Sequence, residues 1–246
     1  MNLLAIDTAT ERFSAALGEF TPLFPRKDAE AQRNGEENKK KIERTWLFEA
    51  DAGMRHSELI MGCIDMLMNK AALTPQDLSG VLCMGGPGSF TGLRIGFSIA
   101  KGIALPLGIP FAAIPTLDCI AWPFSAWPGL VVPVIDAKKS SFFCALYRSG
   151  KRLCADMDAS PADIARTIID TGLRDQVLLT GPGAALLYEK WDATNLSITL
   201  GKNLRWGNAA SLPEIARETN IFAKNTDNHY ADGPVYIRKS DAELNE

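Results

Sequence analysis

Polar side chains gather in the turn that follows the first apolar segment of the chain. Asp7, Thr8 and Thr10 place a carboxylate and two hydroxyls beside backbone amides, a combination that can hold a phosphate or a magnesium ion. Asp136 ends a later apolar segment in the same way. Short polar side chains also commonly bond their own turn. Without a second acid paired with Asp7, this structural role is the favoured interpretation of the first turn.

A glycine-rich turn further along the chain leaves a predicted strand and enters a predicted helix. Gly86, Gly88 and Ser89 lie where the free amides of a helix start can hold an anion. The turn lacks the Gly-Lys-Ser/Thr of a P-loop, and Thr91 stands where G-x-G-x-x-G needs its last glycine. Pro87 replaces the first glycine of G-x-S-x-G, so Ser89 is a poor nucleophile. We therefore expect Ser89 to cap the helix.

The histidines and cysteines offer little for catalysis or metal binding. The sequence contains two histidines, His56 and His229, far apart along the chain. His56 could be a general base, but no serine or cysteine nucleophile can be placed beside it, which favours a structural or partner-contacting role. The five cysteines show no C-x-x-C spacing, so we interpret them as buried, reduced thiols. We expect no metal site and no cofactor.

The composition is that of an ordinary globular protein. Apolar residues make up 46% and charged residues 22% of 246 residues. The net charge of -3 gives no broad basic field for binding nucleic acid directly. Reduced cysteines and an acid at position 7, too early for a secretory signal, predict a cytoplasmic protein. Three interruptions break the longest apolar stretch, residues 103–115, so no membrane anchor is expected.

The apolar patterns predict two successive copies of one α/β arrangement. The first comprises strands over 3–6, 13–17 and 45–50, a helix over 57–70, a strand over 80–84, a helix over 90–105 and a short strand near residue 110. The second comprises strands over 131–135, 142–147 and 177–180 and helices over 161–171, 184–191 and 212–218. This order predicts an α/β, two-lobed fold of the actin/hexokinase (RNase H-like) type. The expected lobes are residues 1–116 and 117–246, with the C-terminal helix able to pack back on the first lobe.

A charged insertion, residues 22–44, separates the second and third predicted strands. It carries seven basic and five acidic residues and few apolar ones, which is typical of a solvated loop. The three lysines at 39–41 could contact RNA, but the neighbouring glutamates offset their charge. The solvated loop is the favoured interpretation.

The two helices of the first lobe carry more apolar surface than one sheet should cover. In the first helix, residues at helical spacing form a core stripe, and three methionines widen it on both sides. In the second, glycines and an alanine at four-residue spacing predict a bare ridge that another helix could approach. We expect a partner interface at this place, formed by His56, Leu59, Ile60, Met61, Cys63, Ile64, Met68, Gly92, Arg94, Gly96 and Ala100. A helix that is simply buried in a large domain remains the alternative.

Several segments resemble one known family. These are residues 4–11, LAIDTATE; residues 56–58, HSE; residues 86–96, GPGSFTGLRIG; residues 132–137, VPVIDA; and residues 234–238, PVYIR. Together they are similar to the TsaB (YeaZ) family, and they span nearly the whole chain. Residues 22–44 depart from the family pattern, in which the hairpin usually closes with a much shorter turn.

The resemblance implies a non-catalytic subunit of the bacterial machinery that makes threonylcarbamoyladenosine in tRNA. Such a subunit binds TsaD, its catalytic paralogue, works with the ATPase TsaE, forms a homodimer when alone and meets tRNA only through the complex. The modified adenosine lies next to the anticodon. TsaD has two metal-binding histidines just after an Ile-Pro step. Asp118 and Trp122 stand near those positions here, so the resemblance implies that the metal site is missing.

Two enzymatic functions remain as alternatives. One is an actin-fold ATPase or kinase that uses Asp7 and Asp136 around magnesium and Gly86 to Ser89 around phosphate. The other is a peptidase, suggested by the name glycoprotease that related sequences often carry. The peptidase ranks last because the sequence shows no nucleophile with its base.

Overall fold

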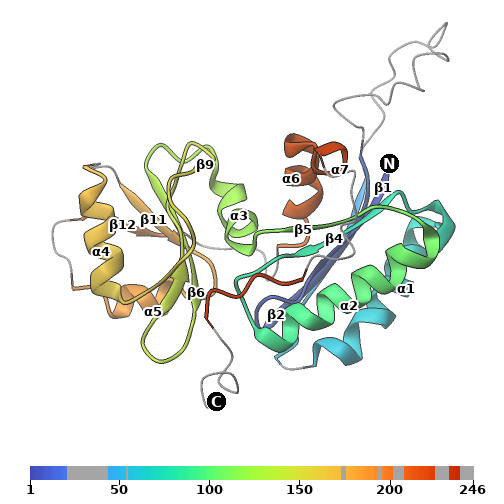
Figure 1. Ribbon diagram of the computed structural model, residues 1–246, viewed down its shortest axis with the longest axis horizontal. Coiled ribbons are helices and arrows are strands. Elements are labelled where there is room, and N and C mark those ends of the chain that lie inside the picture. The colour runs from blue at the N-terminus through green and yellow to red at the C-terminus, as the bar shows by residue number, and fades with distance from the viewer. Residues whose placement is uncertain are drawn as a thin grey trace, which may run out of the picture.

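The computed structural model describes residues 1–20, 44–53, 55–172, 176–192, 196–201, 208–224 and 233–238. It contains two sheets with helices packed on them (Figure 1). The first sheet has the order β3-β2-β1-β4-β5. Its strands are β1 (Asn2–Asp7), β2 (Arg12–Glu19), β3 (Thr45–Asp51), β4 (Gly80–Met84) and β5 (Phe111–Ile114). β2 runs antiparallel to β1 and β3, whereas β4 runs parallel to β1 and β5.

The second sheet repeats this arrangement. Its main path is β10-β7-β6-β11-β12, in which the first, second and third strands of the copy are β6, β7 and β10. The strands are β6 (Leu130–Asp136), β7 (Phe142–Cys144), β10 (Met157–Ala159), β11 (Val177–Thr180) and β12 (Ile198–Leu200). The matching strand orders and directions confirm the prediction of an α/β fold of the actin/hexokinase type.

One predicted strand of the second sheet is wrong in its extent. The apolar run over 142–147 was predicted as a single strand, but β7 ends at Cys144 and a second strand, β8 (Tyr147–Arg148), begins beyond it. β7 and β8 both pair with β6, and β8 forms a hairpin with β9 (Lys151–Arg152). The side chains of Ala145 and Leu146 are buried, so the hydrophobic pattern continues through the break and hides it.

Helices cover both faces of the first sheet. Alternate residues of β1 point to opposite faces, so Leu4 and Ile6 pack with α1 (His56–Ala71) and α2 (Phe90–Leu107), whereas Leu3 and Ala5 pack with α6 (Ser211–Thr219). Figure 1 shows α6 and α7 (Ile221–Lys224) on the face opposite α1 and α2. A segment from the end of the chain therefore completes the core of the first sheet.

Most of the remaining helices pack on or next to the second sheet. Val132 and Val134 of β6 face the core formed with α4 (Pro161–Asp170) and α5 (Ala184–Glu189). The opposite side of β6 packs against α3 (Thr116–Ala121), which lies between the two sheets and continues into the 3-10 helix η3 (Trp122–Phe124). Another 3-10 helix, η2 (Pro75–Asp77), precedes β4.

Two other expectations concern the charged insertion and membrane-spanning helices. Most of the charged insertion, residues 21–43, lies outside the described residues, so its predicted solvated state stays a prediction. Among the described helices, none has the length and apolar character that crossing a membrane requires.

Candidate functional site

A cleft of about 680 Å³ lies between the two sheets. The β1–β2 turn and the start of α1 line it from the first sheet, and the β6–β7 turn lines it from the second. The glycine-rich turn and the segment over residues 233–238 complete its walls. The cleft brings together Thr10, Gly88, Ser89 and Asp136 from the predicted phosphate-binding residues.

Asp7 does not line this cleft, because its carboxylate is buried and used to hold the fold together. Its Oδ1 accepts a hydrogen bond from the amide of Ala9 at 3.0 Å, and its Oδ2 accepts one from the amide of Asn208 at 2.9 Å. Burial raises the pKa of Asp7 above its ordinary value, although both amides act in the opposite direction. The second bond fastens the chain just before α6 to the first turn.

The threonines of the first turn also bond the protein itself. Thr8 donates a buried hydrogen bond from Oγ1 to the carbonyl of Gly92 at 2.7 Å. Thr10 accepts one at Oγ1 from the amide of Arg12 at 3.3 Å. These bonds match the structural role that we favoured for the turn and leave Thr8 unable to reach a ligand in the cleft.

The glycine-rich turn packs tightly against its own chain. Gly86 has a φ of 104° and its amide donates to Oγ1 of Thr116 at 3.1 Å. The amide of Ser89 donates to the carbonyl of Ala9 at 2.7 Å, and a Cβ on Gly88 would come within 3.0 Å of that same carbonyl. Because the amides of Gly86 and Ser89 are already bonded, they cannot cradle a phosphate as the structure stands. Ser89 caps α2 as expected, accepting the amide hydrogen of Gly92 at 3.2 Å.

Asp136 does face the cleft, next to a strained turn. Its Oδ1 accepts from the Lys138 amide at 2.8 Å and its Oδ2 from Lys138 Nζ at 3.0 Å. Burial alone would raise the pKa of Asp136, but the two hydrogen bonds and the charge of Lys138 together lower it. Lys138, Lys139 and Ser140 all have left-handed backbone conformations, with φ values of 61°, 53° and 62°. Such conformations are costly for residues other than glycine and are often found at functional sites.

His56 is buried and joins α1 to the first turn. Its Nε2 lies 2.8 Å from the carbonyl of Thr10, and its Nδ1 has no hydrogen-bond partner among the described residues. No hydrogen bond connects His56 with Ser89 in the described part of the chain, and the Oγ of Ser89 is engaged in the helix cap. Ser89 and His56 thus do not form a nucleophile activated by a base.

The sequence patterns gave no structural role to residues 233–238, which cross between the two sheets (Figure 1, red). The amide of Val235 donates to the carbonyl of Gly85 at 2.8 Å, and Tyr236 accepts from Arg94 Nε at 3.1 Å. Farther on, Arg238 forms a two-bond ion pair with Asp158 of the second sheet. We call residues 233–238 the strap. Residues 234–238 were noted only for their resemblance to the TsaB family. They show neither a helical nor a strand pattern of apolar residues, so the sequence could not predict their contacts with the two sheets.

The predicted partner interface requires a correction on α2. Gly92, Gly96 and Ala100 are buried and face inward. A Cβ on Gly92 would come within 3.0 Å of the Thr8 carbonyl, and one on Gly96 would lie 2.5 Å from Thr8 Oγ1. The bare ridge therefore makes room for the turn of the same chain, and a partner helix has no access to it.

The same correction applies to five of the seven residues proposed on α1. Ile60, Cys63, Ile64 and Met68 are buried in the core beneath α1, and so is His56 at its start. Leu59 is partly buried against the same core. This leaves Met61 on α1 and Arg94 on α2 as the proposed interface residues that are exposed.

The outward face of α1 and α2 nevertheless carries large apolar side chains. Met61, Met66 and Leu105 are 48%, 40% and 60% exposed. Gly62 and Gly102 are exposed as well, and a Cβ at either position would meet nothing within 4 Å. We call these five residues the outer helix face.

The residues near the positions of the TsaD metal ligands have other partners here. Asp118 accepts hydrogen bonds from Tyr147 and Arg152, and the indole of Trp122 donates to Glu214 at 2.7 Å. Across the described ranges, no group of three or more metal-binding side chains comes together. Asp118 is thus part of a hydrogen-bond network that joins α3 to the β8–β9 hairpin.

The repeated sheets and the cleft between them place the chain in the actin-like class of two-lobed α/β proteins. A solved structure from Pseudomonas aeruginosa, described as an uncharacterized protein with similarity to peptidase YEAZ, has this fold. It superposes with a TM-score of 0.69 and 19% identity and covers 96% of this chain and 99% of its own. The TsaD family, tRNA N6-adenosine threonylcarbamoyltransferase, matches residues 50–178, more than half of the chain.

Two relatives named tRNA threonylcarbamoyladenosine biosynthesis protein TsaB refine the assignment. The Bacillus subtilis protein is 38% identical over 93 residues. This match covers only 38% of this chain and 41% of the length of that relative. The Haemophilus influenzae protein is 26% identical over 252 residues and aligns over 97% of this chain and 94% of its own length. The chain belongs to the TsaB (YeaZ) family, within the wider TsaD-like family.

Proposed function

We propose that this chain is a non-catalytic subunit of the machinery that makes threonylcarbamoyladenosine next to the anticodon of tRNA. The names of its relatives and the match to the TsaD family support this role. In this proposal the chain binds TsaD and stabilises its active form, and TsaE acts on the resulting complex. tRNA meets the complex and not this chain alone, in keeping with the net charge of -3.

The observation that carries the proposal is the outer helix face. Large exposed apolar side chains can mark a binding surface, and methionine adapts to irregular partners. A glycine inside a helix costs about 1 kcal/mol relative to alanine, which calls for a packing reason. Among the described residues, none gives Gly62 or Gly102 such a reason, since an added Cβ at either position would meet nothing within 4 Å. A helix of TsaD packed against them supplies one, and a second copy of this chain does so in the homodimer.

The groups of the cleft support a role without catalysis. Asp7, which the ATPase alternative needs for magnesium, is buried behind the first turn, and Asp136 is paired with Lys138. The peptidase alternative needs a base beside Ser89, yet His56 is bonded to a backbone carbonyl. Tight binding of magnesium-ATP by the isolated chain would favour the ATPase instead.

The test is reconstitution of tRNA modification from purified components, each omitted in turn. Activity that requires this chain supports the proposal, whereas full activity without it contradicts the proposal.

Variants then locate the contact. Gly102→Leu adds a side chain in open space, so it should leave the monomer folded but hold a partner helix away. Overpacking of this kind costs about 1–3 kcal/mol, roughly a five- to hundredfold loss of affinity for TsaD by calorimetry. Met61→Asp should also weaken binding, because it buries an unpaired charge in the interface. Ile169→Asp, on α4 and 53% exposed, is the matched control and should bind normally.

A further inference from the structure

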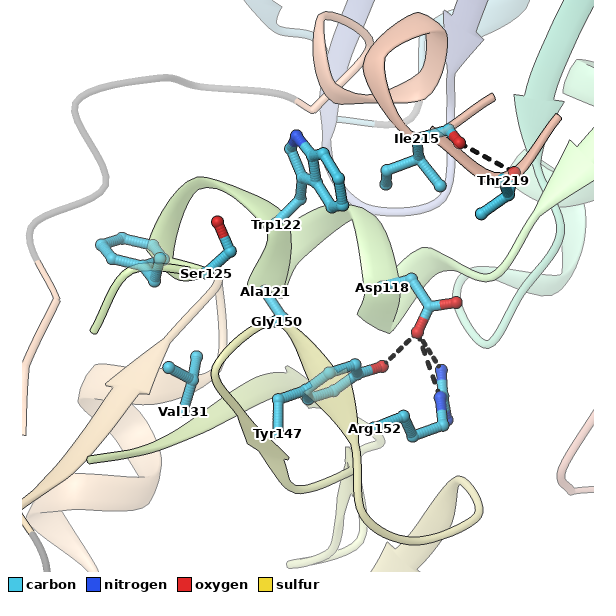
Figure 2. A pocket seen from close by; sticks show the side chains of 11 residues that line it. Asp118, Ala121, Trp122, Ser125, Val131, Tyr147, Gly150, Arg152, Ile215 and Thr219 are labelled. Carbon is cyan, nitrogen blue, oxygen red and sulfur yellow. Dashed lines mark hydrogen bonds and ion pairs between the residues drawn. The ribbon is translucent and has the colours of Figure 1, made fainter. Parts of the chain in front are cut away.

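A second cavity, of about 270 Å³, lies where α3 and η3, the β8–β9 hairpin and α6 meet (Figure 2). It shares no lining residue with the cleft. Ile215 belongs to the core under α6, whereas Val131 and Tyr147 belong to the core next to α3. The cavity, which we call the seam pocket, therefore lies between the two cores of the molecule.

The walls of the seam pocket are mainly aromatic and aliphatic. Trp122, Phe124 and Tyr147 contribute rings, and Val131 and Ile215 contribute branched side chains. Its volume is just below the roughly 300–1,000 Å³ of pockets for drug-sized ligands. A ligand of one ring or a short chain would fit it.

One end of the seam pocket carries an incompletely used carboxylate. The hydroxyl of Tyr147 donates to Asp118 Oδ1 at 2.5 Å, and Arg152 donates to the same oxygen through Nη2 at 2.7 Å and Nε at 3.0 Å. Oδ2 of Asp118 accepts no hydrogen bond from any described residue, and in Figure 2 it points away from both donors. An acceptor is thus available at the pocket.

The charge at this end is negative. Arg152 also pairs with Asp156, so two carboxylates share a single guanidinium. Burial and the charge of Asp118 raise the pKa of Tyr147, which keeps the phenol neutral and able to donate. An anionic ligand would be repelled here, while a cation would find an open carboxylate oxygen.

We propose that the seam pocket binds a small organic cation, an ammonium or amidinium group on a body of one ring or a short chain. The cationic group bonds Oδ2 of Asp118, and the body packs against the apolar walls. The rings of Trp122 and Tyr147 add cation–π attraction. Because the walls come from both cores, an occupied pocket ties the two lobes together. This site is independent of the outer helix face and of the proposed function.

The first test compares three probes of one shape and different charge: benzylamine, benzyl alcohol and benzoate. The readout is the indole N–H resonance of Trp122 in the isotope-labelled full chain, assigned with Trp122→Phe. Benzylamine should shift it saturably and bind about tenfold more tightly than benzyl alcohol, because a half-exposed ion pair and a cation–π contact each contribute a few-fold. Benzoate should cause no shift. Equal binding of all three probes, or no saturable shift with benzylamine, overturns the proposal.

The second test removes the charge. In Asp118→Asn the amide oxygen can still accept from Tyr147 and Arg152, while an NH2 group replaces Oδ2. The tenfold preference for benzylamine should disappear. Asp170→Asn, exposed at the end of α4, makes the same change in net charge outside the pocket and should keep the preference. A preference retained in Asp118→Asn overturns the proposal; if that variant does not fold, the three probes on the natural chain still decide.

Discussion

Gly92 offers a sharp test of why α2 contains glycines on its buried side. In Gly92→Ala, the new methyl group would come within 3.0 Å of the Thr8 carbonyl, a backbone atom that cannot move without shifting the whole first turn. The matched variant is Gly102→Ala, on the same helix, where the methyl group meets nothing within 4 Å. The same chemical change should therefore have opposite effects at the two positions.

The expected magnitudes follow from three contributions. Overpacking costs about 1–3 kcal/mol, and disturbing the buried bond from Thr8 to Gly92 costs about 1 kcal/mol. The higher helix propensity of alanine relative to glycine offsets about 1 kcal/mol of this loss. Gly92→Ala should thus lose about 1–3 kcal/mol of unfolding free energy, whereas Gly102→Ala should gain up to about 1 kcal/mol.

Urea denaturation followed by circular dichroism measures both values. For a chain of this length each kcal/mol corresponds to roughly 2–4 °C in Tm, so thermal melts provide a second readout. Equal stability of the two variants would refute the reasoning, since it would mean that the first turn moves away from α2 at little cost.

Three other predictions concern the first turn, the helix cap and the strap. The raised pKa of Asp7 means that protonation of its carboxyl group favours the folded state. This contribution to the unfolding free energy is fully present below the ordinary pKa of 3.8 and is lost as the pH rises through the raised pKa. The unfolding free energy of the natural chain, relative to that of Asp7→Asn, should therefore fall over this pH range, and a difference that stays constant with pH would contradict the prediction. Ser89→Ala should lower the unfolding free energy by about 1 kcal/mol in urea melts, because α2 loses its cap; Ser89→Asp should restore most of it. Arg238→Met removes the bonds to Asp158 and Ser141 and should increase proteolysis of the strap while Tm changes little; unchanged cleavage would show that the other strap contacts suffice.

The sequence predicts most elements of this fold because their hydrophobic periods are clear. The alternation in β1 and the stripe on α1 each follow from a single face that must be buried. The prediction that failed on α2 depends on contacts between distant residues. The spacing of Gly92 and Gly96 predicts that another segment packs closely against them, but it does not say whether that segment belongs to a partner or to the same chain. The position of Thr8 in the structure shows that it belongs to the same chain.

In the candidate site, too, the sequence predicts local features but not contacts between distant segments. The cap at Ser89 is local and could be predicted from its neighbours. Asp7 could be recognised as a turn residue, but its bond to Asn208 joins positions that no local pattern connects. The strap and the seam pocket were missed for this reason, since both form only when separate segments meet.

The covering of the first sheet by α6 has a consequence for how the chain folds. Asn208 bonds Asp7 across a sequence separation of 201 residues, and Leu212 and Ile215 close the sheet face on which Leu3 and Ala5 lie. During synthesis, that face stays uncovered until the whole second sheet has been made. Contacts of such long range slow folding, and an uncovered apolar face invites aggregation. A fragment that ends after the first sheet should therefore need a chaperone or α6 supplied as a separate peptide to remain in solution.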